Sequence, residues 1–137
     1  HPLDAALFGY PDWTSFNGEA ADMLHPLGAE IYTRFYLDKH DPRLRKLSSD
    51  YSHWYGQEML EVMPSMAALG YDAGAFLIQW IQDSRGHIDE LLDGEQMYEG
   101  LQSSFRMGHG DGNAGYVNTS LYFVKFKPNG TAKVIVR

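Results

Sequence analysis

Tyr10, Asp12 and Trp13 are the residues whose types and spacing are best suited to binding a small molecule. They follow a short apolar run, residues 5–8, that predicts a buried strand. In open α/β sheets, the loops beyond the carboxyl ends of the strands line the ligand crevice. An aromatic ring covers the apolar face of an amino acid or sugar, while a carboxylate accepts hydrogen bonds from an ammonium or hydroxyl group. We therefore expect these residues, together with Tyr36 at the end of the next predicted strand, to bind a ligand; ordinary loop packing is the alternative.

Patterns for catalysis and metal binding are weak. The chain has no cysteine, and its six histidines show no H-x-H, H-x-x-H or H-E-x-x-H spacing. No G-x-S-x-G elbow is present, and the neighbouring carboxylates Asp89 and Glu90 lie on a predicted helix surface with nothing apolar nearby to raise a pKa. The glycine-rich loop of residues 108–115 lacks the features of a phosphate or calcium loop, and we interpret it as a connection between strands. We predict no catalysis, no metal and no cofactor.

Composition limits the class of protein. The chain has 137 residues, a formal net charge of -7, 44% hydrophobic and 14% aromatic residues. This length suits one domain, and the apolar content argues against intrinsic disorder. The excess of acidic residues argues against nucleic acid as a partner, because phosphate binding needs a basic surface. No apolar run approaches the roughly 20 residues of a membrane span.

The predicted secondary structure that holds the candidate residues alternates between strands and helices. The predicted strands cover residues 5–8, 30–36, 98–105, 121–127 and 131–136, the last two forming a hairpin around Pro128-Asn129-Gly130. The predicted helices are a short one ending at Leu24, one from Asp41-Pro42 to Gly56, a longer one after Pro64-Ser65, and a short one at 89–92. This order predicts the α/β class, with a mainly parallel sheet, flanking helices and a C-terminal β-hairpin. Helical spacing places Trp54, Tyr71 and Trp80 in the predicted core.

A series of segments, in order along nearly the whole chain, resembles a known family. They are residues 7–13, residues 31–36, the helix ending in Trp54-Tyr55-Gly56, residues 68–73 with Gly-Tyr-Asp-Ala, the Tyr98-x-Gly-Leu-x-x-x-Phe105 segment, and residues 122–126 before Asn129-Gly130. In this order they resemble the C-terminal part of a type I periplasmic binding protein, the branched-chain amino-acid receptor family of ABC transporters.

The resemblance implies that the chain is part of a type I periplasmic-binding-protein fold and that the fold is incomplete. Residues 1–137 would be one C-terminal segment of a two-lobed domain, a fragment supplying the last strands and helices of the second lobe and the return to the first. Tyr10, Asp12 and Trp13 match the strand-end loop that faces the ligand cleft, and the ligand would be amino-acid-like or sugar-like. Uncovered helix stripes and sheet edges then predict either a missing N-terminal lobe or self-association.

Two functions follow from the resemblance. The first is a non-catalytic, receptor-like solute-binding module of the bacterial cell envelope, the substrate-binding component of an ABC transporter for amino acids or related ligands, with a membrane permease as partner. The alternative is an envelope scaffold or regulatory protein associated with peptidoglycan, as in receptor-like proteins joined to LysM modules, although these residues contain no LysM pattern. Both imply a periplasmic or lipid-anchored location; no signal peptide is visible. A small α/β enzyme is a third hypothesis, and it would require a deep pocket with a perturbed acid or histidine.

Overall fold

The chain folds into two compact units, unit 1 from residues 1–34 and 121–137 and unit 2 from residues 35–120. The structure is a computed structural model, and it describes residues 5–16, 18–85, 87, 96–110, 112 and 115–137. Unit 1 is therefore built from two separate stretches of sequence, and unit 2 from the stretch between them. The chain passes from one unit to the other after Arg34 and again after Ser120.

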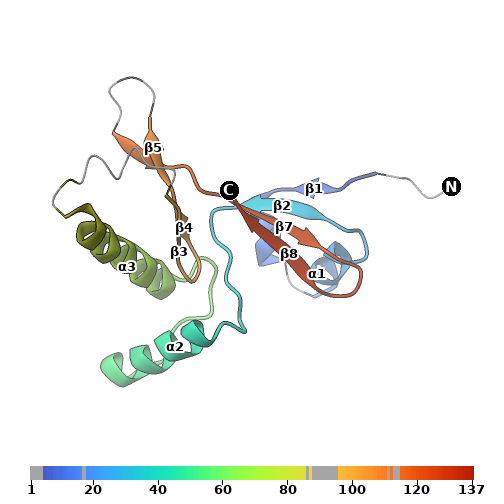
Figure 1. Cartoon of the computed structure of the whole chain (residues 1–137). Helices are drawn as coiled ribbons and strands as arrows, with labels where there is room; N and C mark the ends of the chain where they lie inside the picture. Colours follow the sequence, from blue (N-terminus) through green and yellow to red (C-terminus); the bar gives the residue numbers. More distant parts are fainter. Residues whose placement is uncertain (1–4, 17, 86, 88–95, 111, 113–114) are drawn as a thin grey trace. The chain divides into compact units, whose positions relative to one another are not determined.

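Unit 1 is a four-stranded sheet with two short helices. Its elements are β1 (Phe8–Gly9), the 3₁₀ helix η1 (Pro11–Ser15), α1 (Glu19–Leu24), β2 (Glu30–Thr33), β7 (Tyr122–Phe126) and β8 (Ala132–Val136). The strand order is β1-β2-β7-β8 (Figure 1). Only β1 and β2 are parallel, whereas β2–β7 and β7–β8 are antiparallel. The α/β class is confirmed, but the prediction of a mainly parallel sheet is wrong, because β2 pairs with the distant C-terminal hairpin.

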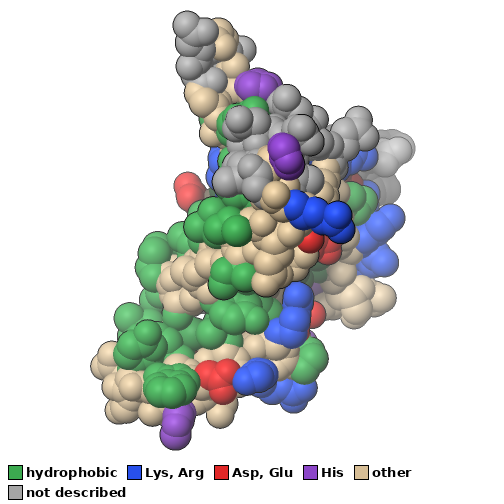
Figure 2. Space-filling model, turned by 60° about the vertical axis from the view of Figure 1, so that its left-hand side comes forward, with side chains coloured by type: hydrophobic (Ala, Val, Ile, Leu, Met, Phe, Trp, Pro, Cys, Tyr) green, Lys and Arg blue, Asp and Glu red, His purple; other side chains and the backbone are tan. Residues whose placement is uncertain are grey.

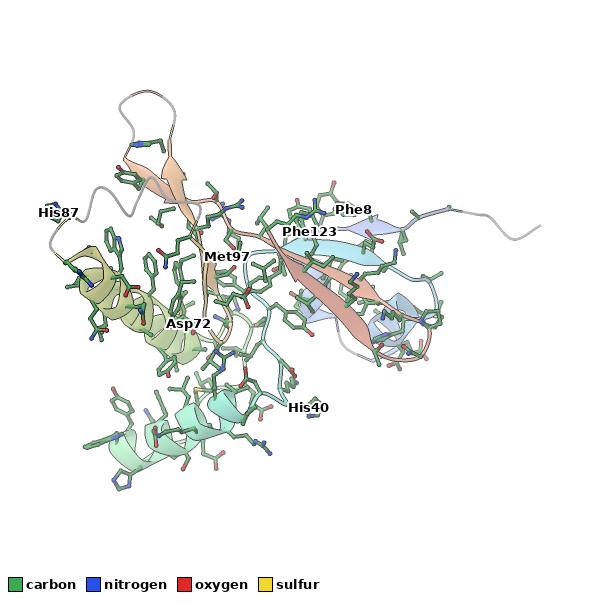
Figure 3. The ribbon with its side chains drawn as sticks, viewed as in Figure 1. Phe8, His40, Asp72, His87, Met97 and Phe123 are labelled. Carbon is green, nitrogen blue, oxygen red and sulfur yellow. The ribbon has the colours of Figure 1, made fainter. Side chains whose placement is uncertain are left out.

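The two faces of this sheet differ in burial. Ile31 and Val124 are opposite each other in the β2–β7 register and are fully buried, together with Leu24 of α1. On the other face Phe8 stacks on Tyr32, with ring centroids 5.8 Å apart, and remains more than half exposed. Phe8 and Phe123 lie on the same side of the sheet (Figure 3). The expected buried strand over residues 5–8 is thus wrong: β1 starts at Phe8, and residues 5 and 6 are exposed.

The helices of unit 2 begin where local capping predicts. In α2 (Pro42–Tyr55), the Asp41 side chain accepts a hydrogen bond from Arg43 N at 2.8 Å, and Gly56 ends the helix in the left-handed region with φ 67°. Hydrogen bonds from the Arg43 side chain and backbone lower the pKa of Asp41. In α3 (Met66–Ser84), the hydroxyl of Ser65 accepts from Ala68 N at 3.3 Å. Both predicted starts are confirmed.

The remaining strands of unit 2 are short. They form two antiparallel pairs, β3 (Tyr98–Glu99) with β4 (Ser104–Phe105), and β5 (Met107–His109) with β6 (Tyr116–Asn118). The predicted continuous strand over 98–105 is therefore a tight hairpin, because the chain reverses at residues 100–103. The glycine-rich segment was predicted to be a connection between strands over residues 108–115, but Gly108 and His109 belong to β5, and neither β5 nor β6 was predicted. The helix expected at 89–92 lies outside the described residues.

Candidate functional site

The loop after β1 is organised as the short 3₁₀ helix η1. Pro11 occupies its first position, where a missing N–H costs nothing. The amide of Trp13 donates to Tyr10 O at 3.1 Å, and the hydroxyl of Thr14 donates to Pro11 O at 2.8 Å. The turn thereby holds Tyr10, Asp12 and Trp13 on one short segment at the carboxyl end of β1, where the sequence placed them.

The three side chains differ in how available they are. The Tyr10 side chain is 68% exposed and Asp12 is exposed as well. The ring of Trp13 is half-buried, lies against Gly9, and stacks with Phe16 at 5.7 Å between centroids. Tyr10 and Asp12 can therefore meet a ligand directly, whereas packing accounts for part of the Trp13 surface.

Gly9 is the position that admits the Trp13 ring. A Cβ at this position would overlap the six-membered ring of the indole. Gly9→Ala should therefore displace the ring and lower the free energy of unfolding by about 1–3 kcal/mol, the usual cost of overpacking. Urea denaturation and the emission of Trp13, with Trp54 and Trp80 replaced by Phe, measure both effects. Gly74→Ala is the matched control, since nothing lies within 4 Å of its Cβ; an equal response of the two variants would contradict this packing.

Tyr36 belongs to unit 2 and not to the segment that carries the other three residues. It lies beyond the end of β2, is half-buried, and its amide donates to Gln102 O at 2.9 Å. Burial, with a smaller effect of the nearby Asp38 charge, raises the pKa of the Tyr36 phenol. The phenol therefore stays protonated across the physiological range.

The most tightly held carboxylate in the described structure is one that sequence reasoning treated only as part of a motif. Asp72 of α3 has no exposed surface. Its Oδ1 accepts from Leu101 N at 2.6 Å, and its Oδ2 accepts from Gln102 N and Ser103 N, both at 2.8 Å. Figure 3 shows Asp72 on the side of α3 that faces the β3–β4 hairpin. Asp72, the Asp of the Gly-Tyr-Asp-Ala segment, thus holds the turn of the β3–β4 hairpin in place through three hydrogen bonds.

The side chain of Gln102 connects the same turn to Ser65, the residue that caps the start of α3. Its side-chain Oε1 accepts from Ser65 N at 2.7 Å, and its Nε2 donates to Ser65 O at 3.2 Å. Like Asp72, Gln102 is completely buried. The interior of unit 2 is consequently rich in polar groups whose hydrogen bonds fix one arrangement of α3 and the hairpin.

The apolar side chains of unit 2, in contrast, are largely outside. A groove of about 370 Å³ runs between α2 and α3, lined by Leu47, Asp50, Tyr51, Trp54, Tyr55, Met66, Ala67, Gly70 and Tyr71. Trp54 is 78% exposed and Tyr71 is 50% exposed, so their predicted place in the core is wrong; Trp80 is half-buried. Figure 2, turned toward the side of α2 and α3, shows hydrophobic side chains gathered there. Helical periodicity identified apolar faces on both helices. The β3–β4 hairpin packs against Phe76 of α3, whereas Trp54, Met66 and Tyr71 along the groove remain exposed in the described structure.

No group of three or more His, Asp or Glu side chains is placed among the described residues to hold a metal ion. None of the described helices combines the length and apolarity needed to cross a bilayer.

The chain was compared with family models, curated proteins and solved structures. No family model matches the chain, and no curated protein matches it. Among solved structures, it is similar to an ABC transporter substrate-binding protein from Desulfitobacterium hafniense in complex with Leu, with 20% sequence identity and a TM-score of 0.42. The match covers 98% of this chain and 36% of that protein. The chain therefore spans about a third of the length of that binding protein.

Proposed function

We propose that the chain is the C-terminal part of a two-lobed, non-catalytic solute-binding receptor of the type I periplasmic class, serving an ABC transporter in the cell envelope. The observation that carries the proposal is the division of the chain. Unit 1 takes strands from residues on both sides of unit 2, so the polypeptide leaves one unit and later returns to it. Repeated crossing between lobes is what the resemblance to hinged receptors implies. In such receptors the ligand binds one conformational state more tightly than the other, and it therefore shifts the population toward that state.

The uncovered helices of unit 2 support an incomplete lobe. In α/β folds, the apolar side of a helix packs on a sheet. Within the described part of unit 2, the only sheets are two-stranded pairs, while Trp54, Met66 and Tyr71 remain exposed. We therefore propose that a β-sheet contributed by the rest of the receptor covers α2 and α3. A second copy of the chain is the alternative cover for the isolated segment.

The loop after β1 supplies the proposed ligand contacts of unit 1. Tyr10 offers an exposed ring, and Asp12 offers a carboxylate one residue beyond Pro11. This pair suits a ligand with an apolar face and an ammonium or hydroxyl donor, which includes amino acids. Tyr36, in unit 2, stays a separate prediction as a ligand contact.

The decisive experiment compares the 137-residue chain with the product of its complete reading frame by titration calorimetry against L-leucine and a panel of amino acids. We expect the complete product to bind and the chain alone to bind at least 100-fold more weakly, because it supplies only some of the contacts. In the complete product, Asp12→Asn and Tyr10→Ala should each weaken binding about ten-fold, the loss of one charged hydrogen bond or one ring contact.

The control is Asp22→Asn, an exposed acidic residue of α1 in the same unit. Binding by the chain alone as tight as by the complete product would refute the shared-site proposal. An unchanged affinity in both Asp12→Asn and Tyr10→Ala would remove the loop from the site.

A further inference from the structure

A second cavity, of about 260 Å³, lies along the C-terminal half of α3 and is independent of the loop after β1. It combines aromatic rings with carboxamide and carboxylate groups, and its lining consists of Phe76, Gln79, Trp80, Asp83, Gln96, Met97 and Tyr98. Figure 3 labels Met97, which lies just before β3. All of these residues belong to unit 2.

The aromatic wall of this cavity is held in place by ring packing. Phe76 and Trp80, one turn apart on α3, stack at 5.8 Å with an interplanar angle of 7°. Phe76 also stacks on Phe105 of β4 at 4.6 Å, and Tyr98 of β3 lies at 5.9 Å from Phe76 with its ring tilted by 56°. A wall fixed from several sides loses little conformational entropy when a ligand binds to it.

The polar groups are arranged on the same side of the helix as Trp80. Gln79 Nε2 donates to Asp83 Oδ2 at 2.8 Å, which orients the carboxamide and the carboxylate relative to each other. Gln96 adds a second carboxamide from the segment before β3. Carboxamides both donate and accept, and an ionised carboxylate accepts, so together they match groups that do both, namely hydroxyls.

Trp80, one of the rings that line the cavity, carries an indole N–H without an acceptor among the described residues. Its Nε1 is buried and has no hydrogen-bond partner, a state that among the described side chains it shares only with Ser103 Oγ. A buried donor without an acceptor is unfavourable. A small movement of the ring edge that lets a ligand oxygen reach Nε1 is therefore favoured, and a ligand rich in oxygen acceptors gains from it.

From this combination we propose that the cavity binds a pyranose sugar. A pyranose presents a flat C–H face that packs on an aromatic wall, and hydroxyls around its edge that pair with Gln79, Asp83 and Gln96. A tetraalkylammonium ion would also suit rings beside a carboxylate, but it offers the two carboxamides and the indole N–H nothing to bind. The sugar hydroxyls match both carboxamides and the carboxylate of the cavity. The proposal does not depend on the receptor function.

The test is an NMR titration of the chain with methyl β-D-glucopyranoside and methyl β-D-galactopyranoside. The chain has three tryptophans, so its indole N–H region is simple, and Trp80→Phe assigns the signal. We expect the Trp80 indole signal to move downfield in a saturable way, with a Kd on the order of 1 mM for so small a ligand. The signals of Trp13 and Trp54 should stay in place.

Two variants make the test specific. Asp83→Asn keeps the shape of an exposed side chain and should raise the Kd about ten-fold, the value of one hydrogen bond to a charged group. Asp50→Asn on α2 is the matched control and should leave the Kd unchanged. Equal shifts of all three indole signals, no saturation with either sugar, or an unchanged Kd in Asp83→Asn would each overturn the proposal. A response to tetramethylammonium alone would replace it with an organic-cation site.

Discussion

Asp72→Ala should lower the free energy of unfolding by roughly 3–5 kcal/mol, since it removes a buried group that satisfies several others at once. The carboxylate accepts from the backbone amides of Leu101, Gln102 and Ser103, and Asp72 has no exposed surface. Once it is gone, these amides are left without their acceptor inside unit 2. Asp72→Asn should retain part of the stability, because one oxygen still accepts while the new NH₂ group faces N–H donors.

Urea denaturation followed by circular dichroism measures the loss, and amide hydrogen exchange at Leu101, Gln102 and Ser103 locates it. Asp50→Ala serves as the control, because Asp50 is an exposed helical Asp that pairs with Lys46 on the surface of α2 at 2.6 Å. An exposed pair of this kind contributes little to stability. If Asp72→Ala lowered the free energy of unfolding no more than Asp50→Ala does, the three hydrogen bonds of Asp72 would not stabilise the β3–β4 hairpin.

Gly100→Ala should be nearly as damaging, with a loss of roughly 3 kcal/mol. A Cβ at this position would overlap the Asp72 carboxyl group and lie 2.7 Å from Ser103 O. Neither of these groups can move aside without losing hydrogen bonds. The Asp72 carboxylate is held by three backbone amides, and Ser103 O accepts from Gly100 N at 2.8 Å, which closes the turn.

A double-mutant cycle separates this mechanism from a general intolerance of the turn. In the Asp72→Ala background the obstructing carboxylate is absent, so Gly100→Ala should cost at least 1 kcal/mol less than in the parent chain. Both unfolding transitions are measured in urea. Strictly additive losses would show that Gly100 and Asp72 act separately.

Features encoded by neighbouring residues could be predicted from the sequence. The caps at Asp41 and Ser65 and the turn at Pro128-Asn129-Gly130 need only local hydrogen bonds and backbone preferences, and each lies where predicted. The candidate loop after β1 is likewise local. In each of these cases a few neighbouring residues determine the local backbone geometry.

Features that depend on distant partners could not be predicted. The pairing of β2 with β7 determines that the sheet is mixed, and nothing within residues 30–33 specifies a strand so far along the chain. Trp54 and Tyr71 were placed in the core because periodicity identifies an apolar face without stating what covers it. The role of Asp72 was missed for the same reason, since its donors lie some thirty residues away.

The discontinuity of unit 1 has a consequence for synthesis on the ribosome. Some ninety residues separate β2 from β7, so at about 5–20 residues per second the edge of β2 waits several seconds or longer for its partner. Residues 35–120 are completed in that interval and are free to adopt their own fold first. During this delay the nascent chain exposes Ile31 and an unpaired strand edge, which is the form that chaperones recognise and that proteases cut.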